Sequence, residues 1–357
     1  MVHALKVAYL LASPVETPLP STRVSVLNIL SLLRKSGISG EVIFAPKAPE
    51  ETPDVSTVEE SLLRGDFQIA YFQKIRGESV ERLVKRLSAI GVKSVFGVCD
   101  LVDPVMAELA NATIVVTEFL KSLYPADLQH KIHVVHDGIE RPEFFKNHYR
   151  EDRGSKKNPL RAVLVTSAPL TSLPVLGRPP DWLHVDIVGK YAEDRMGRLR
   201  YARWNVQSMD GGVARRGHYL RFLLDRRISR KPWSADGVYS DLLAADIGII
   251  PEYRNGMVDR HSGVPHSQMK SENRLTLKMA TGLAVLASPI PAYEAIVEQG
   301  RNAFLATTYD SWLEKLEILR DPQIRSGIGI RARESVLNEF SIERQAQKLI
   351  EVFRALA

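Results

Sequence analysis

The amino-acid sequence predicts an α/β protein built from two doubly wound domains that face each other across a cleft. Short runs of apolar and β-branched residues alternate with helical patterns, which is typical of βα units around a parallel sheet. This alternation occurs twice, on either side of a polar segment. The chain has 357 residues, 45% of them hydrophobic and 25% charged. Because such a length exceeds what one hydrophobic core usually supports, we expect two globular domains.

The first half contains six apolar runs that we interpret as successive strands. They are residues 5–12, 41–46, 67–73, 93–99, 112–118 and 131–138. After the first run, Ser21 is a plausible helix N-cap, the apolar residues that follow form one helix face, and Gly37 ends the helix. A further helix is expected over residues 78–90. These elements complete one doubly wound domain.

A polar segment follows at residues 147–159, with the sequence NHYREDRGSKKNP. It has almost no apolar side chains to bury, as expected for a linker between domains. This indicates a boundary near residue 157. We therefore expect an N-terminal domain over residues 1–150 and a C-terminal domain over residues 151–340.

The second half repeats the pattern of the first. Strands are expected at residues 161–168, 184–190, 246–251, 283–288 and 302–307, and helices at 239–245 and 271–281. From Ser341, residues 341–357 form an amphipathic helix that we expect to pack back across the linker. Because ligands of open parallel sheets lie beyond the carboxyl ends of the strands, two such domains would enclose a deep cleft.

The N-terminal run and the cysteine content favour a cytoplasmic protein. The run at residues 5–12 is much shorter than the roughly twenty residues of a membrane-spanning helix, and no basic region precedes it. The single cysteine, Cys99, cannot form an internal disulfide, and its apolar surroundings favour a buried structural thiol. We expect a cytoplasmic location, with a peripheral contact at the inner membrane face as an addition to it.

Positive charge is concentrated in the segment 195–231, which begins at Arg195 and ends at Lys231. This segment holds ten arginines and one lysine against two aspartates, whereas the whole chain has a formal charge of +6. Such a density suits an anionic membrane or a polyanionic acceptor, and nucleic acid is the least expected partner. The aromatic residues within the segment would permit stacking on sugars. A solvated, arginine-rich insertion is the alternative.

Three stretches of the C-terminal half resemble retaining glycosyltransferases of the GT-B architecture, family four. They are DLLAADIGIIPEY from residue 241, KSENRLTLKMATGLAVLASPIPAYEAIVEQGRNAFLAT from residue 270, and SWLEKLEILRDPQIRSGIGIRARESV from residue 311. Weaker similarities in the N-terminal half are LPSTRVSVLNILSLLRKSG, VFGVCDL, IVVTEFL and HVVHDGIE. The resemblance covers nearly the whole chain. It implies two Rossmann-like domains, with a nucleotide-sugar donor in the C-terminal domain, an acceptor in the N-terminal domain, and transfer with retention.

The stretch that begins at Lys270 contains the expected site for the donor diphosphate. A helix N-terminus offers unpaired N–H groups and partial positive charge, and cationic side chains add charge-assisted hydrogen bonds. We expect Lys270, Ser271 and Arg274 to bind the diphosphate. Lys190, which follows a strand, is a further candidate. The alternative is that these basic side chains lie in solvent, as basic residues near helix starts often do.

The sequence departs from the family at a pair of glutamates eight positions apart, the second of which binds the donor ribose. Met269 and Leu277 occupy these positions here, and a shift of one residue brings Lys270 and Lys278 there instead. None of these side chains accepts a hydrogen bond from a ribose diol. The departure leaves the donor open and raises the prospect of an inactive member.

Other residues are candidates for the sugar, the ribose and the acceptor. Glu272 or Asn273 would replace the missing ribose ligand from one turn earlier. Asp100, at the end of the fourth strand, would orient an acceptor hydroxyl or the sugar and is the candidate catalytic residue. Arg23, in the first βα turn, would bind an anionic acceptor or a phosphate.

We therefore expect a metal-independent, retaining glycosyltransferase that moves a hexose from a nucleoside-diphosphate sugar to a glycan or lipid-linked acceptor, as in cell-surface polysaccharide biosynthesis. No cofactor is expected beyond the donor, since His130, His133 and His136 alternate along one strand rather than forming a metal site. One alternative is a nucleotide-sugar epimerase of the same architecture. The other is a catalytically silent binding module, which the missing glutamates favour.

Overall fold

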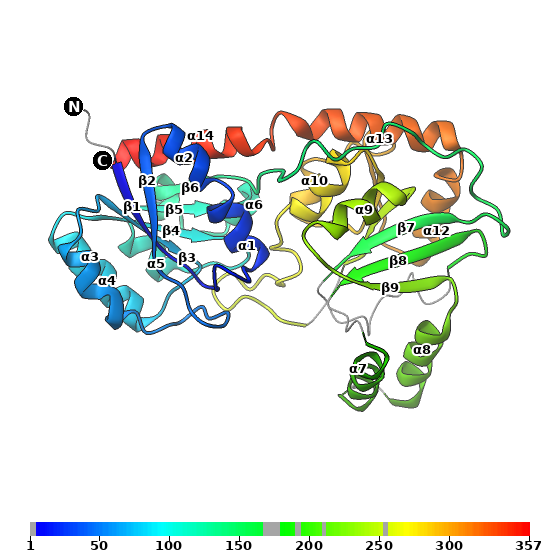
Figure 1. The fold of residues 1–357 in the computed structure, drawn as a ribbon, viewed down its shortest axis with the longest axis horizontal. Helices are drawn as coiled ribbons and strands as arrows, with labels where there is room; N and C mark the ends of the chain where they lie inside the picture. Colours follow the sequence, from blue (N-terminus) through cyan, green and yellow to red (C-terminus); the bar gives the residue numbers. More distant parts are fainter. Residues whose placement is uncertain (1–4, 167–178, 190–193, 209–211, 253–255) are drawn as a thin grey trace. The chain divides into compact units, whose positions relative to one another are not determined.

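The computed structural model describes residues 5–166, 179–189, 194–208, 212–252 and 256–357 (Figure 1). The chain divides into two compact units, which share it in an interleaved order. Unit 1 comprises Met1–Glu140, Gly256–Asn273 and Glu339–Ala357, and unit 2 comprises Arg141–Asn255 and Arg274–Asn338. The divisions therefore fall at residues 140 and 338, where we had expected 150 and 340. The segment Gly256–Asn273, expected in the C-terminal domain, belongs to unit 1.

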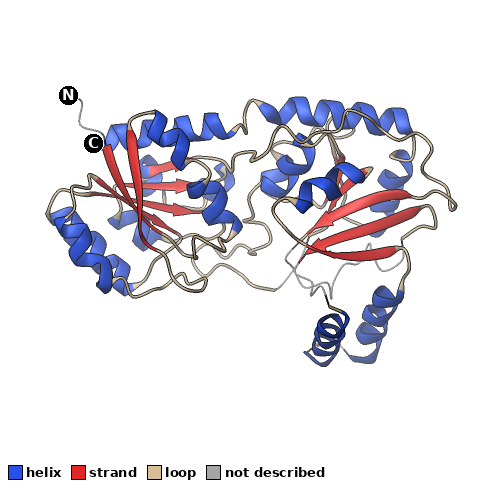
Figure 2. Ribbon diagram, viewed as in Figure 1, coloured by secondary structure: helices blue, strands red, loops and turns tan. Residues whose placement is uncertain are grey.

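Unit 1 is built on a sheet whose strands are red in Figure 2. Within the described residues, six parallel strands follow the order β2-β1-β3-β4-β5-β6. The strands are β1 Leu5–Leu10, β2 Ile38–Phe44, β3 Ile69–Gln73, β4 Lys93–Val98, β5 Ala112–Val115 and β6 Ile132–Val134. They confirm the six predicted runs. The chain passes from β1 to β2 on one side and to β3 on the other, which is the doubly wound topology.

Helices cover both faces of this sheet. They are α1 Pro20–Thr22, the π-helix η1 Arg23–Leu27, α2 Leu30–Lys35, α3 Ser56–Arg64, α4 Glu78–Ala89, α5 Pro104–Leu109, α6 Glu118–Ser122, the 3-10 helix η2 Ala126–Lys131, and α14 Ile342–Leu356. Successive strand residues point to opposite faces, so Ala8 and Leu10 pack with α3, α4 and α5, whereas Val7 and Tyr9 pack with α2 and α14. The predicted terminal helix is confirmed as α14, which belongs to unit 1.

In the part of unit 2 that the structure describes, six parallel strands follow the order β12-β11-β10-β7-β8-β9. They are β7 Leu160–Val165, β8 Leu183–Gly189, β9 Ile228–Pro232, β10 Ile247–Ile250, β11 Ala284–Ala287 and β12 Phe304–Leu305. Strand β9 was not predicted, because three polar residues, Ser229, Arg230 and Lys231, hide its pattern. The other five strands confirm the predicted runs. The fold class, two doubly wound α/β domains, is thus as predicted.

The helices of unit 2 pack around its sheet, except for α7 and α8, which project beside β9 (Figure 1). They are α7 Arg195–Ser208, α8 Gly212–Leu224, α9 Gly237–Ala244, α10 Asn273–Ala280, α11 Pro291–Glu294, α12 Tyr309–Ile318 and α13 Pro322–Leu337. Helix α10 is shorter than the predicted 271–281. It ends at Gly282, which has a φ of +77° and donates its N–H to the Met279 carbonyl at 2.9 Å. The helix C-cap interpretation of this glycine is therefore confirmed.

Two local predictions need correction. Ser21 is not an N-cap, because it lies inside α1, whose N-cap is Leu19. The supposed linker at 147–159 packs on unit 2 instead of standing free: the Tyr149 hydroxyl donates to the Gly282 carbonyl at 2.8 Å, and Arg153 donates to Asp246 at 2.8 Å. No helix in the described part of the chain is long and apolar enough to cross a bilayer.

Candidate functional site

Polar residues follow the apolar strands of unit 1 at their carboxyl ends. Ser13 comes after β1, Lys74 directly after β3, Asp100 after β4, and His136 after β6. Because parallel strands end at the same edge of a sheet, these side chains gather there. This carboxyl edge is where open α/β sheets bind their ligands.

Buried hydrogen bonds fix the loop after β1. The Ser13 hydroxyl donates to the Thr22 hydroxyl at 2.8 Å, and Thr22 donates to Gln73 Oε1 at 2.9 Å. The backbone N–H of Ala12 reaches the same Gln73 oxygen at 3.2 Å. All three polar side chains are buried. The end of α1 is thereby tied to the end of β3, as a pre-organised site requires.

The backbone of Lys74, at this edge of the sheet, has an unusual conformation. Its φ of +59° is the only positive value at a described residue other than glycine, and such strain tends to persist where function requires it. Its ammonium lies 2.8 Å from Asp100 Oδ1 and 3.0 Å from Glu51 Oε1. Burial alone lowers the pKa of Lys74, but Cys99, Asp100 and Glu51 outweigh it and raise that pKa. Lys74 therefore carries its charge inside the protein. No pattern in the sequence singled out this lysine.

Asp100 lies between two lysines. Its Oδ1 accepts from Lys74, and its Oδ2 accepts from Lys270 at 2.8 Å. Burial acts to raise the pKa of Asp100, but the charges of Lys74 and Lys270 lower it well below its usual range. The side chain remains a carboxylate at any ordinary pH. A substrate hydroxyl would share these oxygens with the two ammonium groups.

The segment Gly256–Asn273 brings Lys270 to this edge. Its Met269 is buried in the core of unit 1 beside the helices α3 to α5, and Asp259 accepts a hydrogen bond from the Val102 N–H at 3.4 Å. The prediction that Lys270, Ser271 and Glu272 lie in the first turns of a helix is wrong, because α10 begins at Asn273. Burial of the apolar Met269 holds the segment against unit 1 and keeps its following residues out of the helix.

Glu272 contacts His136. The Glu272 side chain is buried, and its Oε1 lies 3.1 Å from His136 Nδ1, which also lies 2.8 Å from the Val116 carbonyl oxygen. Both neighbours are acceptors, so Nδ1 carries the hydrogen. Burial alone lowers the pKa of His136, but Glu272 outweighs it and raises that pKa. The sequence placed Glu272 near the donor ribose, whereas the structure pairs it with a histidine.

Asp137 is a second acid in an unusual setting. Ser25 donates to its Oδ1 at 3.3 Å. Burial and the negative charge of Glu272 raise the pKa of Asp137 to about 7, although hydrogen bonds from Ser271 and Ser25 act against this rise. The carboxyl therefore exchanges its proton near neutral pH. Ser271, expected on a diphosphate, lies beside this carboxyl instead.

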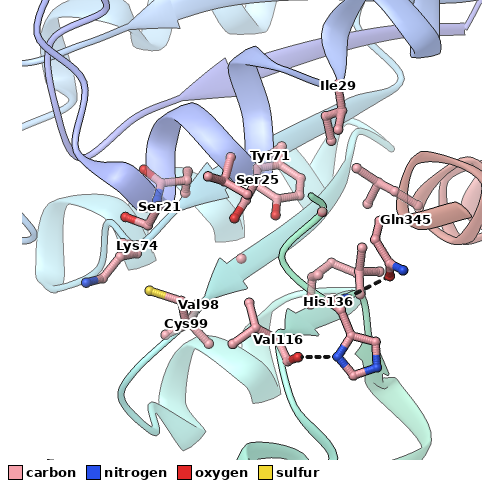
Figure 3. A pocket seen from close by; sticks show the side chains of 17 residues that line it. Ser21, Ser25, Ile29, Tyr71, Lys74, Val98, Cys99, Val116, His136 and Gln345 are labelled. Carbon is pink, nitrogen blue, oxygen red and sulfur yellow. Dashed lines mark hydrogen bonds between the residues drawn. The ribbon is translucent and has the colours of Figure 1, made fainter. Parts of the chain in front are cut away.

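A narrow pocket opens among these residues at the carboxyl edge of the unit 1 sheet. Figure 3 shows Ser21, Lys74 and Cys99 on one side and His136 and Gln345 on the other. Gln345 comes from α14, and its Oε1 accepts from the His136 N–H at 3.0 Å. Hydroxyl, amide, imidazole and ammonium groups line the space together with Val24, Ile29 and Leu349. Such a lining suits a small ligand rich in hydroxyl groups.

Arg23, expected to bind an anionic acceptor or a phosphate, pairs with a carboxylate in the structure. Its guanidinium makes two hydrogen bonds to the Glu140 carboxylate, at 2.7 and 2.8 Å, and Asn28 donates to the same carboxylate at 2.7 Å. This paired geometry ties η1 to the segment after β6. An anionic acceptor would have to compete with Glu140.

The candidates in unit 2 are fewer. Lys190 lies outside the described residues. Arg274 lies in the first turn of α10 and is half-buried. The structure does not bring Lys270 and Arg274 into one unit. Among the described residues, no group of three or more histidine, cysteine, aspartate or glutamate side chains is arranged to hold a metal ion.

Helix α10 also carries a buried lysine. Lys278 is fully buried, and its ammonium reaches only the Arg274 carbonyl oxygen, at 3.4 Å, among the described residues. A Cβ at Gly248 would lie 2.8 Å from Lys278 Cδ, so the glycine of β10 makes room for the chain. Burial and the charge of Arg274 lower the pKa of Lys278 to about 7. The sequence signal was a lysine among the apolar positions of a helix.

Comparison with known proteins relates the fold to glycosyltransferases. No protein-family model and no curated protein sequence matches the chain. A glycosyltransferase from Rickettsia africae has a TM-score of 0.67 at 12% identity, over 100% of this chain and 99% of that one. A sucrose-phosphate synthase from Thermosynechococcus elongatus has a TM-score of 0.66 at 13% identity, over 99% of both chains. Anabaena Alr3699/HepE in complex with UDP and glucose has a TM-score of 0.64 at 14% identity, over 98% and 100%.

At these identities the likeness concerns the fold. It extends along the whole chain and includes both units, each of which has the doubly wound topology. The predicted GT-B architecture is therefore confirmed. The retaining mechanism and membership of family four stay predictions.

Proposed function

We propose that this protein transfers a hexose from a nucleoside-diphosphate sugar to a hydroxyl group of a glycan or lipid-linked acceptor, with retention and without a metal ion. The observation that carries the proposal is the likeness to glycosyltransferase structures along 98–100% of the chain. One of these proteins has been solved with UDP and with UDP-glucose. A cytoplasmic location is part of this proposal.

The pocket of unit 1 would hold the acceptor. Lys74 and Gln345 offer hydrogen bonds to hydroxyl groups, and His136 is held by Glu272 so that its ring keeps one orientation. Fixed donors and acceptors orient a substrate without reorganising during the reaction. Asp100, always ionised, would accept a hydrogen bond from a sugar hydroxyl while the two lysines hold it in place.

The donor diphosphate would lie at the start of α10. Arg274 in its first turn offers a planar guanidinium that binds two phosphate oxygens at once, with Lys190 and Asn273 as the further ligands. Lys270, which belongs to unit 1 and donates to Asp100 at 2.8 Å, was expected on the diphosphate from the sequence, and that role stays a prediction. As the glycosidic bond breaks, negative charge grows on the leaving diphosphate, and these cations would stabilise it.

A thermal-shift panel of nucleoside diphosphates and their sugars tests this proposal. A ligand that binds the folded state raises the melting temperature, so we expect UDP, GDP or ADP sugars to do so. Free hexoses should not, and a chelator should change nothing. Arg274→Ala should weaken binding roughly tenfold to a hundredfold, the loss of one charge-assisted hydrogen bond. Arg301→Ala, which removes an exposed arginine of unit 2, serves as the control.

A catalytically silent binding module is the second candidate. Met269, one of the two residues that stand where the family has glutamates, is buried in the core of unit 1. Both Asp100 oxygens are already engaged by lysines. If nucleotide sugars bind but are not consumed with any acceptor, this candidate replaces the transferase. If none stabilises the protein at millimolar concentration, both are excluded.

A further inference from the structure

The helices α7 and α8 form a surface that is not part of the candidate site at the sheet edges. They project from unit 2 beside its edge strand β9 (Figure 1) and have 14 and 13 residues. Six of the sixteen exposed large hydrophobic side chains in the described chain nevertheless lie on them. These are Met196, Leu199, Trp204, Val213, Leu220 and Leu224. Such a concentration on a short part of the surface marks an interaction site.

Helix α8 is attached to unit 2 by one face. Tyr219 and Phe222 are buried in the core cluster that also contains Ile228 of β9. Arg230 lies with its guanidinium carbon 4.6 Å from the centre of the Phe222 ring and donates to the Phe222 carbonyl at 2.7 Å. These contacts fix which face of α8 points outwards.

The outer face of α8 presents an apolar stripe. Val213, Leu220 and Leu224 stand at positions i, i+7 and i+11, which lie on one side of a helix. Val213 and Leu224 are 86% and 80% exposed. Arg216 and Arg221 lie on either side of this stripe along the helix. An apolar stripe between cationic edges is the pattern of helices that lie in a membrane interface.

Exposed arginines accompany the apolar side chains on both helices and just beyond them. They are Arg198, Arg200, Arg203, Arg216, Arg221 and Arg226. No ion pair with another described residue involves any of these six. Arg227 and Lys231 differ, because Asp225 and Asp241 neutralise them at 2.7 and 2.6 Å. Among the described residues around these six, Asp194 offsets the positive charge only in part, through its attraction to Arg200.

We propose that the α7–α8 surface docks this protein onto an anionic lipid bilayer. The arginines would bind phosphate head groups, and the leucines and Trp204 would enter the boundary between head groups and acyl chains, where tryptophan is favoured. Membrane binding does not require sugar transfer, so its test is independent of the test of the proposed reaction. It would, however, hold the enzyme beside lipid-linked acceptors.

Two other occupants fit less well. A second copy meeting the same face by two-fold symmetry would bring two arginine clusters together, which repel. Nucleic acid would account for the arginines but not for Val213, Leu220 and Leu224, because bases stack on aromatic rings. Trp204 is the only well-exposed aromatic side chain described on the two helices.

Flotation with lipid vesicles tests the proposal on the full chain. We expect binding to vesicles that contain phosphatidylserine, weak binding to pure phosphatidylcholine, and a decrease with salt. Each exposed arginine near the surface contributes roughly fivefold in affinity. The triple variant Arg198→Gln, Arg200→Gln, Arg203→Gln should therefore bind on the order of a hundredfold more weakly. The matched control neutralises exposed cations of unit 1: Arg34→Gln, Lys35→Gln and Lys85→Gln.

A second set of variants tests the apolar contact. Leu220→Ser with Leu224→Ser should remove the binding that persists at high salt, and circular dichroism should remain unchanged because both side chains are exposed. Brominated lipids should quench tryptophan fluorescence in the wild type and in Trp233→Phe but not in Trp204→Phe. Equal binding to neutral and anionic vesicles, or no binding, overturns the proposal. Binding to short duplex DNA without binding to vesicles assigns the surface to nucleic acid instead.

Discussion

Two buried lysines, one in each unit, have opposite surroundings. Lys74 at the carboxyl edge of the unit 1 sheet touches the carboxylates of Asp100 and Glu51, and its pKa is raised. Lys278 on α10 of unit 2 touches no carboxylate of the described residues, and its pKa is lowered to about 7. Burial disfavours the charged form in both cases.

The difference shows what a buried charge needs. A desolvated ammonium stays charged only where attraction to nearby carboxylates compensates for its lost hydration. Otherwise it gives up its proton. Lys74 is therefore a permanent cation beside a pocket, as an anionic or polar substrate would need. Lys278, with a pKa of about 7, gives up its proton near neutral pH, and its long side chain fills space over Gly248.

The largest effect should come from Lys74→Met. It leaves Glu51 without this partner and Asp100 with Lys270 alone, and breaking a buried ion pair typically destabilises by about 3 kcal/mol. We expect the free energy of unfolding, measured with urea at pH 7, to fall by that amount. Lys85→Met, at an exposed site of the same unit, should change it by less than about 0.5 kcal/mol. Equal small effects of both variants would show that the cluster contributes nothing to stability.

Lys278→Met should act in the opposite direction. Methionine fills a similar volume and removes an amine that must be desolvated, so we expect stabilisation on the order of 2 kcal/mol at pH 7. Differential scanning calorimetry of the variant and the wild type measures this. A loss of stability on substitution would mean that the amine makes a favourable contact, and the comparison with Lys74 would then fail.

The pH dependence sharpens the same comparison. Between pH 7 and 10 an unfolded lysine, with a pKa near 10.4, holds its proton, whereas folded Lys278 has lost its own. Because the unfolded state binds more protons in this range, the free energy of unfolding of the wild type rises with pH. We expect the advantage of Lys278→Met to shrink from pH 7 towards pH 10. Lys74, with a raised pKa, does not contribute in this window. An advantage that stays constant from pH 7 to 10 would contradict the lowered pKa.

The sequence predicted most helices and strands of both units, but it did not predict the side-chain contacts around Lys74 and Lys278. The periodic helix at 78–90 is found as α4 Glu78–Ala89, and five of the six strands of unit 2 were visible as apolar runs. Strand β9 was missed because its polar residues Ser229, Arg230 and Lys231 lie on an edge strand and pair with Asp186, the Phe222 carbonyl and Asp241. Hydrophobic periodicity reports burial along one element, and it predicts elements well for that reason.

Contacts between distant residues lie beyond such a pattern. Asp100 and Lys270 were each singled out, for separate roles, but they are 170 positions apart and nothing local indicated that they meet. We considered Met269 only as the residue that stands where the family has a glutamate. Its burial in the core of unit 1 holds the segment Gly256–Asn273 in that unit. Lys74 gave no signal, because its left-handed backbone is a property of the folded loop and not of the residue type.

Asp137→Asn should give the smallest of these effects and extends the comparison to a buried acid. The folded pKa of about 7 lies above the usual value of 3.8, so the contribution of this carboxyl to stability is largest below pH 4 and declines as the pH rises to 7. The amide keeps the Ser25 contact without charge. We expect about 1 kcal/mol of stabilisation at pH 8 that disappears near pH 4, measured by urea unfolding. The same difference at both pH values would show that Asp137 has an ordinary pKa.

The most direct test of the proposed reaction is turnover of a nucleotide sugar with and without an acceptor, followed by the release of nucleoside diphosphate. Using a donor identified by thermal shift, we predict release that depends on a glycan or lipid-linked acceptor and falls strongly in Lys74→Met and Arg274→Ala, with the anomeric configuration retained in the product. Release of nucleotide and an epimerised sugar without any acceptor would indicate an epimerase. A donor that binds but is never consumed, across a broad set of acceptors, would contradict glycosyl transfer.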